Sequence, residues 1–276
     1  MIQSRAMLAT LSISQWTARK YDKAVSSEVE KAHAAHDAGR FNKLLVNKAL
    51  LEPIVKLTGE IRSYHYHTTL PWTDKGDRLL PSILFMDYTV AMRKFRDAFG
   101  VLIDTLVQQY PAEVQAARNR LGTMYQPSDY PDVSEIRRRF SIDVEFTPVP
   151  NAKDFRVDVG EAAAEEIRES ITKAVNDRQN SAMRDCYRRV KDVVSKISER
   201  LSDDKAKFHD SLIENATELL AVLPGLNITD DPELTALHNE ISRSLIVNPR
   251  ALRLDPKLRK DTADAADAIL ARLAWT

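Results

Sequence analysis

The sequence predicts a mainly α fold, an elongated helical bundle that includes a small antiparallel β-sheet. Apolar residues recur at helical spacing over long stretches, for example at Leu84, Tyr88, Ala91, Phe95 and Phe99. Only 7 of the 276 residues are glycine, which disfavours turn-dense β folds. Apolar residues make up 43% of the chain, so a core can be buried at this length.

Three segments alternate in the manner of β-strands. Residues 8–16 alternate through Ala9, Leu11 and Ile13, and residues 140–147 alternate from Phe140 to Phe146. Residues 153–159 repeat this pattern after the loop TPVPNAK. The two later segments are therefore expected to form a β-hairpin, with the N-terminal strand as its third partner.

Helical patterns fill most of the remaining chain. We expect helices over about 18–38, 41–64, 81–106, a short stretch after Pro111, 160–201 and 203–223, and further helices starting at TDDPEL, NPRAL and LDPKL. Pro53 should kink or split the second helix. Residues 160–201 would span roughly 60 Å as one helix, which favours a rod, an antiparallel coiled pair, or a break that the sequence does not reveal. The predicted division is a helical region with the sheet over 1–159 and a long helix with a C-terminal bundle over 160–276, or one continuous domain.

Composition and charge limit the class of protein. The single cysteine, Cys186, can form neither an internal disulfide nor a zinc site of several cysteines, as fits a reducing cytoplasm. The N-terminus is a poor signal peptide and no apolar run is long enough for a membrane span, so we expect a cytoplasmic protein. The net charge is zero, but residues 1–63 carry +4 and residues 201–240 carry −7. This uneven distribution of charge favours attraction of a protein partner or of a second copy of the chain. It is not the overall basic charge that is typical of a nucleic-acid-binding protein.

The motifs of common enzymes are missing. The chain has no G-x-x-x-x-G-K-[ST], G-x-G-x-x-G or G-x-S-x-G sequence, and its acidic residues lie on polar helix faces. We therefore predict a protein without catalytic residues, cofactor or metal. His65 and His67 could share a metal with Asp74 or Asp77. Two histidines without further ligands are more typical of a helix end, where they bond backbone carbonyls.

The stretch from Tyr64 to Pro81, YHYHTTLPWTDKGDRLLP, has two interpretations. As a recognition loop it would present Tyr66, Trp72, Lys75 and Arg78 to a ligand. As a structural corner it would bury Trp72 between Pro71 and Pro81, with Gly76 at a positive φ in the turn TDKGD. The sequence leaves both open.

Basic residues gather around the expected hairpin. Arg137, Arg138 and Arg139 precede it, and Lys153 and Arg156 lie beyond its turn. Tyr125 and Tyr130, just upstream, could stack on a base, so these seven residues form a candidate nucleic-acid site. Asp143 and Glu145 share one face of the first strand and would repel a phosphate backbone there.

Several stretches of the chain resemble a family of proteins. They are SISQWTARK, GRFNKLL, LPWTDKGDRLLP, SDYPDVSEIRRRF, FTPVPNAKDFRVDV, DSLIENATELLAVLPGLNITDDPEL and DAILARL. With them the chain resembles, over most of its length, an uncharacterised group of helical proteins encoded by tailed bacteriophages, prophages and related mobile elements. No established activity comes with that resemblance. Genes of this kind tend to lie beside phage DNA-metabolism genes, which implies a role in the cytoplasm of an infected host cell.

Together these expectations favour a non-enzymatic, self-associating phage protein that acts in DNA metabolism and binds single-stranded DNA. The alternative is an adaptor or scaffold without nucleic-acid contact, for example one that docks on a phage or host ATPase. An uncharacterised enzyme comes third. The first two differ in whether basic and aromatic side chains converge on one exposed groove.

Overall fold

The computed structural model describes residues 2–203 and 206–273, and the predicted mainly α fold is confirmed. These residues form nine α-helices, a four-stranded sheet and a two-stranded sheet. The chain divides into two compact units, each built from separated segments. We call residues 1–10, 64–88 and 145–276 the bundle unit, and residues 11–63 and 89–144 the ribbon unit. The sequence placed a boundary after residue 159, whereas the contacts group residues 145–276 together.

The four-stranded sheet has the order β4-β5-β1-β6, with β1 Ala6–Ser14, β4 Leu70–Pro71, β5 Asp77–Pro81 and β6 Ser141–Pro148. β5 pairs antiparallel with β1 and with β4, so that Leu79 lies opposite both Leu8 and Leu70. These three leucines form a buried row across the strands. The predicted N-terminal strand is thus confirmed, two residues earlier than expected.

The predicted β-hairpin is wrong. β6 forms as expected, but residues 153–159 form no strand: a 3-10 turn, η6 Ala152–Asp154, is followed by irregular chain. Pro148 and Pro150 cannot donate ladder hydrogen bonds, and the Asn151 side chain accepts one from the Lys153 amide at 3.1 Å, which closes the turn. Val157 and Val159 are exposed, so their alternation does not mark a buried strand face.

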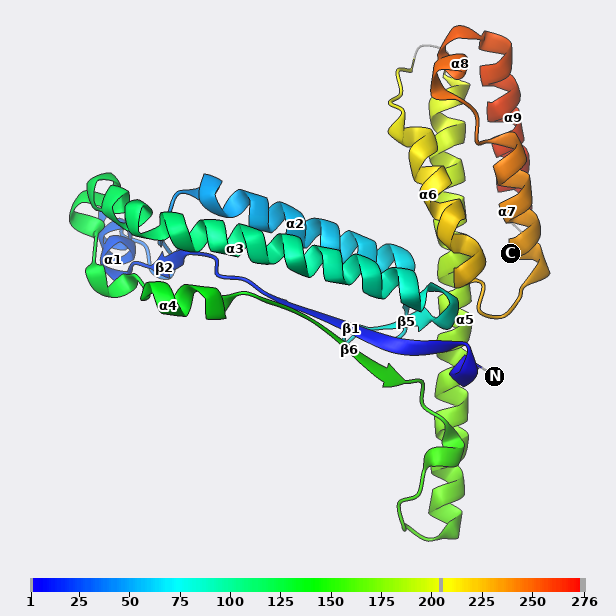
Figure 1. Ribbon diagram of the computed structural model, residues 1–276, viewed down its shortest axis with the longest axis horizontal. Coiled ribbons are helices and arrows are strands. Elements are labelled where there is room, and N and C mark those ends of the chain that lie inside the picture. The colour runs from blue at the N-terminus through cyan, green and yellow to red at the C-terminus, as the bar shows by residue number, and fades with distance from the viewer. Residues whose placement is uncertain (1, 204–205, 274–276) are drawn as a thin grey trace. The chain divides into compact units, whose positions relative to one another are not determined.

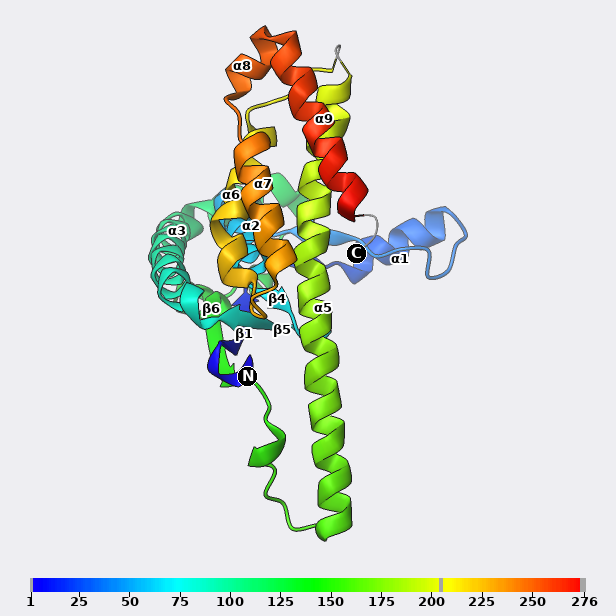
Figure 2. The ribbon, with the colours of Figure 1, turned by 90° about the vertical axis from the view of Figure 1, so that its right-hand side faces the viewer.

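The predicted long helix is confirmed as α5 Glu161–Ser202, with 42 residues. α6 Ser211–Leu226, α7 Pro232–Ser244, α8 Pro249–Leu254 and α9 Pro256–Leu273 complete the bundle unit. α6 and α9 pack along the C-terminal half of α5 (Figures 1 and 2) and bury Val190, Val194 and Ile197 completely. The three helix starts predicted at Pro232, Pro249 and Pro256 are confirmed, whereas the helix expected from residue 203 begins at Ser211.

The ribbon unit contains α1 Lys23–Ala32, α4 Val133–Ile136, most of α2 Lys48–Thr68 and most of α3 Phe85–Leu121. α2 and α3 lie side by side (Figure 1) and continue through Pro53 and Pro111, where the sequence predicted breaks. Both prolines are exposed, while their neighbours Ile54 and Tyr110 are buried. Packing of these neighbours holds each helix through the missing hydrogen bond.

A two-stranded antiparallel sheet replaces part of the helix predicted over 18–38. It pairs β2 Arg19–Tyr21 with β3 Asn42–Leu44, and we call it the ribbon. Arg19 lies opposite Leu44, Lys20 opposite Lys43, and Tyr21 opposite Asn42. α1 is therefore only 10 residues long, and Asp22 caps it by accepting from the Ala24 and Val25 amides.

Candidate functional site

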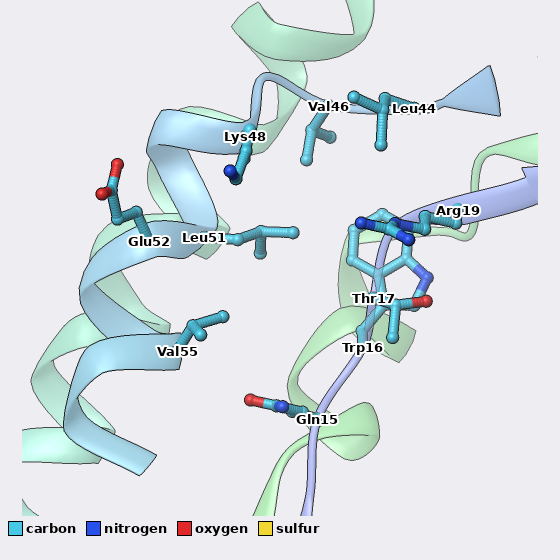
Figure 3. Close-up of a pocket in the computed structure, with 10 residues that line it drawn as sticks. All are labelled: Gln15, Trp16, Thr17, Arg19, Leu44, Val46, Lys48, Leu51, Glu52 and Val55. Carbon is cyan, nitrogen blue, oxygen red and sulfur yellow. The ribbon is translucent and has the colours of Figure 1, made fainter. Parts of the chain in front are cut away.

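An open cleft of about 400 Å³ lies within the ribbon unit, between the chain that leads into β2 and the first turns of α2 (Figure 3). This volume falls in the range of small-molecule sites. Apolar, aromatic, neutral polar and charged side chains line it: Gln15, Trp16, Thr17, Arg19, Leu44, Val46, Lys48, Leu51, Glu52 and Val55. In Figure 3, Leu51 and Val55 point from α2 toward the segment with Trp16, Thr17 and Arg19.

Trp16 is the aromatic side chain of this cleft. Its ring meets the ring of Tyr110 nearly edge-on, with centroids 5.8 Å apart and an interplanar angle of 73°. Tyr110 is buried and donates a hydrogen bond of 2.9 Å to the carbonyl oxygen of Pro131. Burial raises the pKa of Tyr110 to about 12, so its hydroxyl stays a donor at neutral pH. Trp16 is thus held from one side and remains part of the cleft wall.

Ala18 directs the chain so that residues before and after it line one cleft. Its φ is +49°, in the left-handed region, although it is not glycine, and it is buried. Its carbonyl oxygen accepts a hydrogen bond of 2.8 Å from the Leu45 amide. A left-handed alanine costs about 1–3 kcal/mol, and such residues cluster at ligand sites. Here the strained residue separates Trp16 from Arg19, and both line the cleft.

Two cations line the cleft without a neutralising partner. Arg19 and Lys48 are exposed, and in the part of the chain that the structure describes neither forms an ion pair or a hydrogen bond through its side chain. Lys48 is also the first residue of α2, where the helix dipole disfavours a cation. Glu52 lines the cleft too, but in Figure 3 its carboxylate points away from Trp16. The open side of the cleft is therefore suited to an anionic group.

Hydrogen bonds hold the walls of the cleft in place. Arg120 donates to the carbonyl oxygens of Leu44 and Leu45 at 3.0 and 3.2 Å, and the Asn47 amide donates to Glu113 at 3.0 Å. The Thr58 hydroxyl donates to the carbonyl oxygen of Val55 at 2.8 Å and lies 3.3 Å from Oε1 of Gln15.

The predicted residues Arg137, Arg138 and Arg139 form a 3-10 turn, η5, in the same unit. Arg137 forms an ion pair with Asp104, and Arg139 lies 3.8 Å from Glu135. Tyr125 and Tyr130 pack on each other with ring centroids 5.2 Å apart. Two of the three arginines are thus paired with carboxylates, and a role of this group in DNA contact stays a prediction.

Lys153 and Arg156 belong to the bundle unit, and both are exposed. Lys153 borders a shallow depression on α5 that also contains Glu165, Glu169 and Asp177. Arg168 and Lys173 also line it, so three cations and three carboxylates balance there, and a role of Lys153 and Arg156 in DNA contact stays a prediction.

The stretch from Tyr64 to Pro81 is built as a corner. Trp72 is 5% exposed and belongs to the core, Gly76 has the predicted positive φ of 106°, and Lys75 is exposed. Arg78 stacks on Tyr66, with its guanidinium carbon 4.7 Å from the ring centroid, and donates to the Thr69 hydroxyl at 2.7 Å. The interpretation as a corner therefore accounts for the burial, and only Tyr66 and Lys75 present large exposed side chains.

The side chain of Arg189, on α5, binds backbone carbonyl groups of this corner. It donates to the carbonyl oxygens of Tyr66, His67 and Thr69 at 2.9, 2.8 and 2.6 Å, and to the buried carboxylate of Asp185 at 2.7 Å. These carbonyl groups lie at the C-terminal end of α2, where the helix dipole favours a cation such as Arg189.

The two histidines take part in the corner. Nδ1 of His65 lies 2.8 Å from the Tyr88 hydroxyl, and Nε2 of His67 lies 3.2 Å from the carbonyl oxygen of Glu218. Both histidines lie in the last turn of α2, as expected, but the expected contact with a backbone carbonyl is confirmed for His67 and wrong for His65. Within residues 2–203 and 206–273, no three His, Cys, Asp or Glu side chains gather so as to hold a metal ion.

The cleft is not among the sites predicted from the sequence, although QWTARK at residues 15–20 contains the residue types of such a site. An indole followed three and four residues later by cations is typical of a site that pairs stacking with phosphate contact. Trp16 falls at the end of the expected strand 8–16 and Arg19 at the start of the expected helix 18–38, so the predicted elements place these two residues in separate elements.

Comparison with protein-family models, curated proteins and solved structures finds no match for this chain. No helix within the described residues is long and apolar enough to cross a membrane.

Proposed function

We propose that the protein binds single-stranded DNA through the cleft of the ribbon unit, as a non-enzymatic phage protein of DNA metabolism. The observation that carries the proposal is the convergence of Trp16, Arg19 and Lys48 on one open cleft. The phage context comes from the resemblance of the sequence, and the ligand comes from the chemistry of these side chains.

The cleft offers contacts for both the base and the phosphate of an unpaired nucleotide. A base stacked on an aromatic ring contributes about 1–3 kcal/mol, and the wall formed by Leu51 and Val55 offers apolar contact opposite Trp16. Arg19 and Lys48 can neutralise the adjoining phosphate. A base within a duplex is stacked on its neighbours and cannot enter such a cleft, so a single strand is the favoured ligand.

The charge of the ribbon unit supports this ligand. Its two segments carry 17 basic and 13 acidic side chains, a net charge of +4, while the rest of the chain carries 23 basic and 27 acidic, a net charge of −4. The net charge of the whole chain is zero, but the ribbon unit is positively charged and attracts phosphate. The net charge is modest, which predicts salt-sensitive binding with few phosphate contacts.

The adaptor hypothesis has one observation in its favour. Leu44 and Val55, at the rim of the cleft, are 37% and 54% exposed, and a protein segment could cover them. The two hypotheses predict different effects of salt. DNA binding should weaken as salt rises, whereas a protein segment that contacts apolar side chains alone releases no counterions and should bind without this dependence.

The test is a titration of the full-length protein against a fluorescent single-stranded oligothymidylate between about 50 and 200 mM salt. Trp16→Ala should weaken binding about 5- to 150-fold, the equivalent of one lost base stack. Tyr66→Ala is the matched control, because Tyr66 is an exposed aromatic residue of the bundle unit, and it should bind like wild type. Circular dichroism confirms that both variants are folded.

Two results would overturn the proposal. One is wild-type protein that shows no salt-dependent binding to any single-stranded oligonucleotide, which leaves the adaptor hypothesis. The other is a folded Trp16→Ala variant that binds as tightly as wild type with the same salt slope.

A further inference from the structure

The ribbon extends the cleft by one exposed aromatic side chain. Paired residues of an antiparallel ribbon project to the same face, so Arg19 and Leu44 share a face with Tyr21 and Asn42. Arg19 and Leu44 line the cleft. Tyr21 therefore stands next to the cleft on the same face, two residues or about 7 Å beyond Arg19 along the strand.

Packing does not explain the position of Tyr21. Lys43, on the opposite face of the ribbon, is buried, with 4% of its surface exposed. Tyr21 is 45% exposed. Arg40 lies over the Tyr21 ring, with its guanidinium carbon 6.0 Å from the ring centroid. The Trp16 indole and Arg19 thus line the cleft, the Tyr21 phenol follows Arg19 on the ribbon face, and the Arg40 guanidinium lies beside the phenol.

We infer that the ribbon face is a second nucleotide subsite, so that consecutive bases of one strand stack on Trp16 and Tyr21 while Arg19 holds the phosphate between them. This inference rests on the proposed function. Alternation of stacking rings and cations is how proteins follow a single strand without reading its sequence. Arg40 contributes a second positive charge at the Tyr21 end, where the next phosphate would lie.

The experiment separates the two subsites with two small ligands. The dinucleotide TpT carries both bases, and its analogue with an abasic 3′ or 5′ position carries one. Each ligand competes against the labelled oligothymidylate, so that weak binding is measured as displacement. Wild type should bind TpT about 5- to 150-fold more tightly than the tighter-binding of the two abasic analogues, as expected for one base stack.

Tyr21→Ile should remove that preference while the protein stays folded, because isoleucine suits a strand but has no aromatic ring. Tyr21→Phe should retain it, since the ring is kept. Lys20→Ile is the positional control, because Lys20 lies on the opposite face, and it should keep the preference for the second base.

The outcomes distinguish this inference from the proposed function. If Trp16→Ala weakens the binding of TpT while Tyr21→Ile keeps the full preference for the second base, the second subsite is wrong and the cleft stands. A wild type that binds TpT no more tightly than the tighter-binding abasic analogue also overturns the second subsite. If Trp16→Ala leaves binding unchanged, the proposed function itself fails.

Discussion

The ammonium group of Lys43 lies 2.7 Å from the carboxylate of Asp129, on the buried face of the ribbon. It is also 3.3 Å from the carboxylate of Asp22 and donates to the carbonyl oxygen of Met124 at 2.7 Å. Burial lowers the pKa of Lys43, but the hydrogen bonds to Asp129 and Asp22 outweigh it and the pKa is raised. One buried cation thus joins β3, the cap of α1 and the chain before α4, behind the face that carries Arg19 and Tyr21.

Replacement of that cation should destabilise the ribbon unit. Lys43→Met leaves two carboxylates close together without a counterion, which should cost about 3–5 kcal/mol of unfolding free energy. Urea unfolding measures this loss. Lys20→Met is the matched control, because Lys20 is the exposed cross-strand partner of Lys43, and it should stay within about 0.5 kcal/mol of wild type. Equal stability of the two variants would contradict the structural role.

Lys48→Glu should improve stability and weaken DNA binding at the same time. A carboxylate in the first turn suits the helix dipole, so α2 should gain about 0.3–1 kcal/mol. Loss of a phosphate contact should reduce the slope of log affinity against log salt by about 0.7. Lys31→Glu, on exposed α1, makes the same charge change away from the cleft and should leave the slope unchanged. Equal effects of the two variants would show that net charge alone matters.

Trp72→Ala should act on stability alone. Trp72 is in the core, so its loss should cost about 3–5 kcal/mol of unfolding free energy. Among the described residues Nε1 of Trp72 has no hydrogen-bond partner, so Trp72→Phe loses only volume and should cost clearly less. Thermal unfolding compares the two. A Trp72→Ala variant that melts like wild type but loses DNA binding would make the stretch from Tyr64 to Pro81 a recognition loop after all.

His65 should make stability depend on pH. Burial, with a smaller effect of nearby Arg78, lowers the pKa of His65 to about 4, from about 6.5 in the unfolded chain. The unfolded chain therefore binds more protons between pH 4 and 6.5, so stability is lost as the pH falls through this window, by up to about 3 kcal/mol.

His65→Asn, which cannot titrate there, should remove this part of the slope. Urea unfolding at pH 7 and at pH 5 tests both proteins. The same pH dependence in both would assign the slope to other groups.

Self-association remains a prediction from the sequence, and α5 offers a surface for it. Ile167 and Ile171, in its N-terminal half, stay only partly buried. Light scattering at micromolar protein should give a multiple of the chain mass of 31.3 kDa. Ile167→Asp should shift the mass toward the monomer, because a charge on an apolar contact is disfavoured. A monomer for wild type at moderate salt would end this hypothesis.

The sequence by itself determined the elements whose cause is local. The stripe of α5, the helix starts at Pro232, Pro249 and Pro256, and the turn at Gly76 follow from periodicity, caps and backbone preference. Tertiary structure decided the rest. Residues 19–21 form a strand because residues 42–44 pair with them, and α3 passes Pro111 because its neighbour Tyr110 is buried.

The cleft depends on the same distant contacts. Trp16, Arg19 and Lys48 meet in the cleft although they are spread over about thirty residues of sequence. They are brought together by the left-handed backbone of Ala18, by the hydrogen bond from the Leu45 amide to the Ala18 carbonyl oxygen, and by the first turns of α2. QWTARK shows the aromatic and cationic residue types in the sequence. Local propensity disfavours a left-handed alanine, so only the packing around Ala18 shows that Trp16, Arg19 and Lys48 meet in one cleft.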